Sequence, residues 1–299
     1  MSRRIAVSGA SGLVGTALCR ALADRGDTVV TLVRHLDPAQ DEVYWNWTEG
    51  RLETGKLEGL DGFVHLAGKP IAVRWKGKVL REVLESRSKG TQLIAEGLAG
   101  LVDPPEVLVS ASAIGIFGDG RERDFDDTSA RGEGWMANVC SAWESATRPA
   151  ADAGIRVVIP RIGIVLSPDG GALQKMLPAF RFGVAGRIGD GKQGMSWIAL
   201  TDLVRILLYM LDTKALSGSF VATAPNPVSN AEFTRTLARV LRRPAILPAP
   251  AFAISALFGE MGRRLILDGD FIRPSRLLET GFEFEHPGLE AALRHELGC

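Results

Sequence analysis

Short apolar runs alternate with longer amphipathic segments along the first half of the chain. Apolar residues recur at helical spacing after residue 15 and again over 79–98, which predicts two helices. The apolar runs around them predict six buried strands, the first beginning at Ile5 and the others at 28–33, 43–47, 62–68, 107–112 and 157–163. Strands that alternate with helices at this spacing predict an α/β fold with a doubly wound parallel sheet.

Beyond Val165 the pattern changes. The glycine-rich stretch 183–194 has few apolar residues, which is typical of a loop over a site. Pro287 suits the first position of a helix close to the end of the chain. Helical spacing returns in three segments, 201–211, 232–241 and 287–297.

A break in the pattern divides the chain at Pro225-Asn226-Pro227, because proline interrupts both helices and central strands. Residues 1–225 are predicted to form the larger domain, with a loop at 168–197 that reaches toward a ligand. Residues 226–299 are predicted to form a smaller α+β lobe on the same side as that ligand.

The first strand runs into a glycine turn, and a helix follows at once. Spacing of the form Gly-x-x-Gly-x-x-Gly between a strand and a helix is typical of a dinucleotide site. The first glycine permits the tight turn, the second lets backbone approach a pyrophosphate, and the third lets the helix pack against the strand. The free N–H groups of the helix N-terminus face the phosphates. We therefore assign cofactor contacts to Gly9, Ser11, Gly12, Leu13, Val14 and Gly15.

The second strand ends at Arg34, about 20 residues beyond the glycine turn, where an NAD site places Asp or Glu against the ribose 2′-hydroxyl. A guanidinium suits a 2′-phosphate instead, which favours NADP(H) over NAD(H). The alternative is that Arg34 is a solvated loop residue and that Asp37 takes the acidic role.

The remaining cofactor contacts are predicted where other strands end. Trp45 lies where an adenine would rest, and it either stacks on that base or belongs to the core. His65, inside a strand, is expected to be a core histidine. Three strand ends complete the predicted cofactor site: Leu66, Ala67 and Gly68; Ser110, Ala111 and Ser112; Arg161, Ile162 and Gly163.

The composition of the chain limits the kinds of binding partner that we expect. The 299 residues include 35 basic and 35 acidic side chains, and this neutral balance argues against nucleic acid as the principal partner. The longest apolar stretch, 245–258, contains two prolines and is too short to cross a bilayer, so we expect no membrane partner. Cys19, Cys140 and Cys299 are odd in number and far apart, which indicates neither a disulfide framework nor a metal site and favours a cytoplasmic protein. The sequence is compatible with a homodimer.

The ordered set of motifs resembles the extended short-chain dehydrogenase/reductases. It is most similar to an atypical branch, the "epimerase family" proteins of the NAD-dependent epimerase/dehydratase superfamily. The resemblance implies a Rossmann domain that binds NADP(H) and a C-terminal lobe that closes over a substrate cleft. It is carried by Leu66-Ala67-Gly68-Lys69-Pro70-Ile71, Arg74-Trp75, Ser86-Arg87, Ser110-Ala111-Ser112, Trp143-Glu144, Arg161-Ile162-Gly163-Ile164-Val165-Leu166, Pro168-Asp169-Gly170-Gly171, Trp197-Ile198 and Gly281-Phe282-Glu283-Phe284.

The superfamily's usual Tyr-x-x-x-Lys pair is absent. The only tyrosines are Tyr44 and Tyr209, each followed four residues later by a threonine, and the expected positions fall near Met136 and Cys140. Ser112 is the remaining catalytic candidate. It either orients a substrate carbonyl or hydroxyl, or satisfies the end of its own strand.

The stretch 189–198 resembles the loop by which nucleotide-sugar epimerases hold their ligand. Met195 stands where those enzymes place an arginine, and the loss of one charge-assisted phosphate contact removes about 1.5–3 kcal/mol. A nucleotide sugar is therefore disfavoured. We assign substrate contacts to Phe117, Gln193, Met195 and Trp197.

Three functions follow from these observations. The first is an NADP(H)-dependent oxidoreductase that acts on a small carbonyl or hydroxyl compound without the usual catalytic pair. The second is a non-catalytic NADP(H)-binding regulator or scaffold. The third is a nucleotide-sugar epimerase, which Met195 and the missing pair both oppose.

Overall fold

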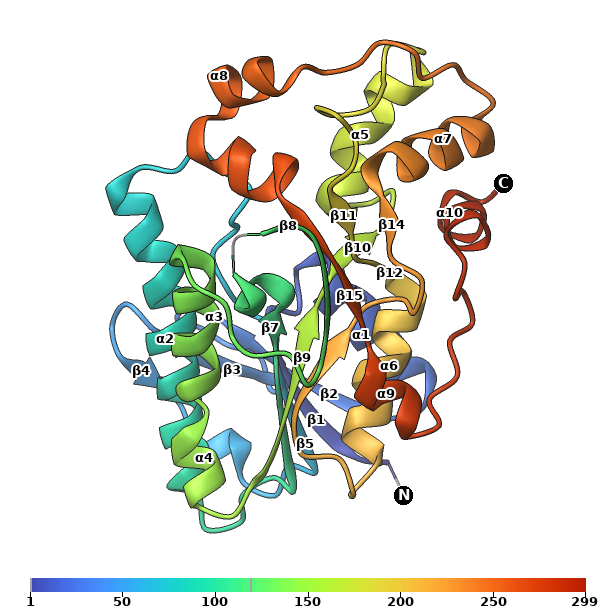
Figure 1. Cartoon of the computed structure of the whole chain (residues 1–299). Coiled ribbons are helices and arrows are strands. Elements are labelled where there is room, and N and C mark those ends of the chain that lie inside the picture. The colour runs from blue at the N-terminus through green and yellow to red at the C-terminus, as the bar shows by residue number, and fades with distance from the viewer. Residues whose placement is uncertain (1, 119) are drawn as a thin grey trace.

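A central parallel sheet organises the computed structural model, which describes residues 2–118 and 120–299 (Figure 1). Its strands run in the order β13-β9-β6-β5-β1-β2-β3-β4, and β7 (Ser112–Ala113) pairs with β9. Only β4 is antiparallel to its neighbour. The order reverses beside β1, so the predicted doubly wound sheet is confirmed. The bounds are β1 (Arg4–Ser8), β2 (Thr28–Val33), β3 (Glu42–Asn46), β4 (Arg51–Leu52), β5 (Gly62–His65), β6 (Val107–Ser110), β9 (Arg156–Ile162) and β13 (Gly218–Ala222).

Helices cover both faces of the sheet. Successive strand residues point to opposite faces, so Val7 packs in the apolar cluster of α1 (Leu13–Asp24) and α6 (Leu200–Asp212), while Ala6 packs in that of α2 (Gly77–Ala99). The second face is completed by α3 (Trp135–Ser145) and α4 (Arg148–Asp152) (Figure 1). This alternation explains why the strands read as continuous apolar runs in the sequence.

The later part of the chain forms a layer beyond the carboxyl ends of the strands (Figure 1). Three short strand pairs support it: β10 (Ile164–Leu166) with β12 (Trp197–Ala199), β11 (Gly194–Met195) with β14 (Val228–Ser229), and β8 (Arg121–Asp126) with β15 (Gly269–Arg273). The helical segments are η1 (Gly55–Leu57) and η2 (Ile114–Phe117) within the sheet region, and then α5 (Gly171–Arg181), α7 (Asn230–Leu241), α8 (Ala251–Gly262), η3 (Arg263–Leu267), α9 (Ser275–Glu279) and α10 (Leu289–Leu297).

One predicted boundary is wrong. The last helix begins at Leu289, with Gly288 as its N-cap, so Pro287 precedes the helix instead of opening it. The segment before this helix is held by Asn226, whose side-chain amide donates to the Pro287 carbonyl at 3.0 Å. This bond keeps Pro287 outside the helix.

The apolar core continues across the predicted division at residue 225. Trp197 and Leu207, which precede it, share one cluster with Phe233, Leu237 and Leu293, which follow it. The separation into residues 1–225 and 226–299 therefore stays a prediction. Within the described part of the chain, no helix combines the length and the apolar composition needed to cross a bilayer.

Candidate functional site

A cavity of about 1170 Å³ opens at the carboxyl ends of β1, β2, β3 and β5. In open α/β sheets, this edge beside the reversal of strand order is where ligands bind. The wall includes eight of the residues assigned to a cofactor from sequence: Gly9, Ser11, Gly12, Arg34, Trp45, Leu66, Ala67 and Gly68. It also includes residues that sequence reasoning did not assign: Ala10, Thr31, Leu32, Val33, His35, Glu42, Asn46, Trp47, Thr48, Lys69, Pro70, Glu82 and Ser86.

Each of the three glycines in the turn is needed for a different structural reason. Gly9 has φ +74°, and a Cβ there would lie 2.9 Å from the backbone nitrogen of Ala67. A Cβ on Gly15 would lie 2.1 Å from the Gly9 carbonyl oxygen, so this glycine lets α1 pack against the turn. At Gly12 the only atom that a Cβ would meet within 4 Å is the same carbonyl, at 3.2 Å. Gly12 is therefore the position where an added side chain would extend into the cavity.

The N-terminus of α1 is arranged to receive an anion. Gly12 is the N-cap, no side chain caps the helix, and its first turn contains no acidic residue. The backbone N–H groups of the first turn, including those of Leu13 and Val14, carry the positive end of the helix dipole. Leu13 and Val14 can contribute through backbone alone, because Leu13 packs against Gly170 and Val14 against the core.

Arg34 lies at the rim of the cavity and is exposed. No hydrogen bond or ion pair joins its guanidinium to another residue of the described chain, so it is available to a ligand. The acidic side chains in this wall are Glu42 and Glu82, whereas Asp37 lies outside the described lining. Glu42 accepts from the Ala39 N–H at 2.9 Å and pairs with His35 at 2.8 Å. The Ala39 N–H, followed by His35, holds the pKa of Glu42 below its usual range.

Trp45 lines the cavity and packs against His65, which lies in the core behind it. Trp45 is 5% exposed, its ring meets that of His65 edge-on at 5.9 Å, and its indole N–H is buried without a partner. Ser8 and Thr91 hydroxyls lie 2.6 Å and 2.9 Å from the two ring nitrogens of His65. Burial, with a smaller contribution from the Arg87 charge, lowers the pKa of His65 to about 3. His65 is therefore a neutral core residue, as expected.

Arg87 places a half-buried cation behind the cavity wall. Its guanidinium stacks on the Trp143 ring at 4.9 Å and donates to the carbonyls of Lys69 and Val83. A Cβ on Gly68 would lie only 3.3 Å from it. Burial lowers the pKa of Arg87, and no carboxylate in the described chain forms an ion pair with it. Sequence reasoning gave Arg87 no role, because its nearness to Gly68 depends on how α2 packs.

The next strand ends hold a hydrogen-bonded group of three side chains. Arg161, at the end of β9, donates through Nε and Nη2 to the two carboxylate oxygens of Glu144 in α3, both at 2.9 Å. Ser112, the register partner of Arg161, donates through its hydroxyl to Glu144 Oε1 at 2.7 Å. All three are largely buried, with side-chain exposures of 15% and 16% for the ion pair. Sequence reasoning used Glu144 only as a family marker and missed this contact.

This geometry fixes what Ser112 can do. Its single hydroxyl hydrogen points at Glu144, so the oxygen can only accept a hydrogen bond from a ligand. Such an arrangement suits a hydroxyl donor, and it provides a carboxylate to which a proton can pass through the serine. The hydroxyl is satisfied by Glu144 of α3 and not by its own strand, and contact of Ser112 with a substrate stays a prediction.

The other titratable candidates are structural. The Tyr44 hydroxyl donates to Glu49 and the Tyr209 hydroxyl to the Thr280 carbonyl. Burial, with a smaller contribution from Glu144, raises the pKa of the Cys140 thiol to about 12. None of these groups provides the proton exchange of a Tyr-x-x-x-Lys pair.

The remaining predicted cofactor residues lie along the same edge but outside the described cavity wall. Ser110 and Ala111 are buried, and the Ser110 hydroxyl has no partner. A Cβ on Gly163 would lie 2.5 Å from the Ser196 carbonyl, so this glycine permits a close backbone approach. Ile162 is half-buried against the core. Their contact with a cofactor stays a prediction.

The four predicted substrate residues are buried. Phe117 stacks on Phe125 with ring centroids 5.2 Å apart, and the Trp197 indole donates to the Asn226 carbonyl at 3.1 Å. The Met195 sulfur accepts from the Asn230 amide at 3.5 Å. The Gln193 amide donates to two backbone carbonyls, at Ile188 and Ile266. The Gln193 amide oxygen is buried without a hydrogen-bond partner in the described chain. Contact of these four side chains with substrate stays a prediction.

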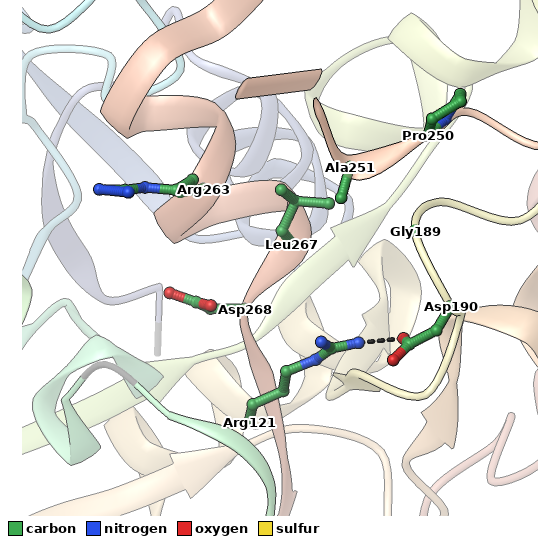
Figure 2. Close-up of a pocket in the computed structure, with 8 residues that line it drawn as sticks. All are labelled: Arg121, Gly189, Asp190, Pro250, Ala251, Arg263, Leu267 and Asp268. Atoms are coloured by element: carbon green, nitrogen blue, oxygen red, sulfur yellow. Dashed lines mark hydrogen bonds and ion pairs between the residues drawn. The ribbon is translucent and has the colours of Figure 1, made fainter. Parts of the chain in front are cut away.

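A second cavity, of about 440 Å³, lies between β8, the 183–194 loop and the segment from α8 to η3 (Figure 2). Arg121 forms an ion pair with Asp190 across it, and Leu267 and Ala251 face this pair from the other side (Figure 2). This cavity is lined by residues from both sides of position 225, and the substrate role predicted for the C-terminal segment stays a prediction.

Comparison with known proteins agrees with this architecture. Residues 5–221 match the NAD dependent epimerase/dehydratase family, and residues 249–296 match a domain of unknown function, DUF1731. The chain is 39% identical over 290 residues to the epimerase family protein MT2273 of Mycobacterium tuberculosis, covering 97% of this chain and 96% of that protein. It is 34% identical over 295 residues to human epimerase family protein SDR39U1, covering 97% and 98%.

Two solved structures extend the comparison. The crystal structure of human SDR39U1 (isoform 2) with NADPH superposes with a TM-score of 0.90 at 33% identity, covering 99% of both chains. A nucleoside-diphosphate sugar epimerase from Corynebacterium glutamicum superposes with a TM-score of 0.82 at 32% identity, covering all of this chain and 59% of that one.

Proposed function

Since the chain belongs to the NAD dependent epimerase/dehydratase family, we propose that it binds NADP(H) in the 1170 Å³ cavity. The similar human protein was crystallised with NADPH, which supports this choice of cofactor. Arg34 supports it independently, because an unpaired guanidinium at the end of β2 matches a 2′-phosphate.

The residues present fit such a dinucleotide. The free N–H groups at the start of α1 would hold the pyrophosphate beside Gly12, where the missing Cβ leaves room. Trp45 would contact the adenine from the cavity wall. Arg87 would supply positive charge from behind Gly68, and a bound phosphate would give this half-buried cation the anionic neighbour that it lacks in the described chain.

We propose further that the protein is an oxidoreductase that acts on a small hydroxyl compound, with the reverse reaction on the carbonyl. When bound, the cofactor would supply the hydride chemistry needed to interconvert the hydroxyl and the carbonyl, and the residues around Gly12 would hold it. Ser112 Oγ would accept the hydroxyl proton while its own proton passes to Glu144, and Arg161 would hold the Glu144 carboxylate in place. The observation that carries this assignment is the Ser112–Glu144 hydrogen bond, which makes Ser112 an acceptor.

The test combines cofactor binding with turnover. Purified protein is incubated with NADP⁺ and a panel of small secondary alcohols, and NADPH formation is followed by its absorbance. Ser112→Ala and Glu144→Gln should each lower kcat by about a hundredfold or more, because each interrupts the proton path. NADPH affinity, measured by titration, should stay within about twofold. Equal turnover by Ser112→Ala and the parent protein would refute the role of Ser112.

A second function is favoured by the buried state of the candidate catalytic groups. Ser112 is 2% exposed and the pKa of Cys140 is about 12, which would suit a regulator or scaffold that binds NADP(H) without turnover. Tight NADPH binding with no turnover across the panel would support that function over the oxidoreductase. A nucleotide-sugar epimerase is the weakest candidate, because Met195 is buried against Asn230 where an arginine is expected.

A further inference from the structure

Helix α8 and the segment that follows α5 lie at the top of the molecule in Figure 1, and both carry exposed apolar residues. We define the α8 face as residues 181–187, which begin at the last residue of α5, and residues 242–264, which include α8. Ten large apolar side chains are exposed in the described chain, and seven of them belong to this face, which is far from an even distribution. They are 40–83% exposed: Phe182, Val184, Ile246, Leu247, Phe252, Leu257 and Phe258. Gathered apolar surface of this kind marks an interaction site, whereas single exposed residues do not.

Hydrogen bonds bring the two segments of the α8 face together. The Leu247 N–H donates to the Ala185 carbonyl at 3.1 Å, and the Ala249 N–H donates to the Arg187 carbonyl at 3.0 Å. The Arg243 side chain donates to the Arg181 carbonyl at 3.1 Å. Since α8 begins two residues after Ala249, these bonds hold both segments at one end of the fold (Figure 1).

The same face is strongly basic. The whole chain is neutral, but the two segments contain six arginines and one acidic residue, Glu260, which gives a net charge of +5. Five of these arginines are exposed: Arg181, Arg187, Arg242, Arg243 and Arg263. Asp190, the nearest acidic residue after 181–187, forms an ion pair with Arg121, outside the face. Asp268, the nearest one after 242–264, forms an ion pair with Arg264 and so neutralises the half-buried arginine of the face, which leaves the five exposed arginines. Positive charge therefore surrounds the apolar side chains.

We propose that the α8 face docks on the surface of an anionic phospholipid bilayer. Phe and Leu side chains would enter the boundary between headgroups and acyl chains, while the arginines would contact lipid phosphates. The 12-residue α8 is too short to span the membrane, so it would lie along the surface. This proposal replaces the expectation that the protein has no membrane partner, which rested on the absence of a spanning segment.

Charge also argues against a second copy of the chain as the occupant. A two-fold contact through this face would place the five exposed arginines of one copy against those of another, and like charges across an interface oppose association. An anionic bilayer instead complements both the apolar and the basic parts of the face.

The test uses the full chain and sedimentation with phosphatidylcholine vesicles prepared with or without phosphatidylglycerol. The parent protein should sediment with the anionic vesicles, less at high salt, and weakly with the neutral ones. The double substitution Phe252→Asp and Leu257→Asp should lower the partition coefficient by about tenfold or more, because it removes two apolar contacts and adds two negative charges. Both residues are more than 70% exposed, so the fold should tolerate the change.

Val102→Asp is the matched control, because Val102 is 95% exposed in the loop between α2 and β6, outside the α8 face. Its vesicle binding should equal that of the parent protein. Failure to bind anionic vesicles, equal binding to neutral ones, or an equal loss in Val102→Asp would overturn the proposal. So would a double variant that changes the oligomeric state but not vesicle binding. NADPH titration of each variant should be unchanged, which separates this proposal from the proposed function.

Discussion

Gly12→Val tests the cofactor site most directly. Gly12 caps α1 with φ −80°, so valine adds no left-handed strain, and its Cβ would meet only the Gly9 carbonyl, at 3.2 Å. The branched side chain would extend into the space assigned to the pyrophosphate. Loss of two hydrogen bonds to a charged phosphate costs about 3–6 kcal/mol at about 1.5–3 kcal/mol each, which weakens NADPH binding by about a hundredfold or more.

The assay is fluorescence titration of NADPH, accompanied by chemical denaturation of each variant. Gly288→Val is the matched control, because Gly288 is also an N-cap glycine with negative φ, and a Cβ there meets nothing within 4 Å. Both variants should lose up to about 1 kcal/mol of stability from the poorer cap. Only Gly12→Val should lose NADPH affinity. Parent-like affinity in Gly12→Val, or an equal loss in Gly288→Val, would refute the assigned site.

Three further predictions concern selectivity and stability. Arg34→Ser should weaken NADPH binding by about tenfold or more and leave NADH binding unchanged, because only the 2′-phosphate contact is lost; titration with both cofactors measures this, and equal losses would contradict it. Arg161→Met should lower the free energy of unfolding by about 3 kcal/mol, because it leaves the buried Glu144 carboxylate without its cationic partner. The exposed pair of Arg148 and Asp152 supplies the control, since Arg148→Met should cost less than about 0.5 kcal/mol in the same denaturation assay. The pKa of His65 falls from about 6.5 in the unfolded chain to about 3 in the fold, so the unfolded chain binds more protons between these values and stability falls as the pH is lowered through this window. Between pH 6.5 and 5 this loss should reach about 1.5 kcal/mol, and His65→Gln should flatten that part of the stability curve.

The strands of the sheet could be predicted because each is a local apolar run, and all six predicted runs contain an observed strand. The glycine turn could be predicted for the same reason, since Gly9, Gly12 and Gly15 lie within seven residues. The strand β13 was missed because its sequence, Gly-Ser-Phe-Val-Ala, is short and opens with two weak strand formers. Its place at the sheet edge depends on pairing with β9, which no local pattern records.

The chemistry of the site was less accessible to sequence reasoning. Ser112 could be singled out by its strand, but its partner Glu144 lies 32 residues later on a helix, and their contact depends on tertiary packing. Arg87 is a similar case, because its burial depends on the Trp143 ring above it. Sequence reasoning thus found residues that act through backbone or local position, and missed those that act through a distant neighbour.

The pairing of β8 with β15 has a consequence for synthesis of the chain. Arg121 lies in register with Gly269, so 148 residues must be added after Arg121 before its partner strand begins to emerge. At ribosomal rates of about 5–20 residues per second, this interval is roughly 7–30 s. Throughout it, β8 exposes an unpaired edge, and its sequence, Arg-Glu-Arg-Asp-Phe-Asp, carries five charges in six residues. Charged edge strands resist pairing with other chains, so the composition of β8 protects the nascent protein from aggregation until its own C-terminal segment arrives.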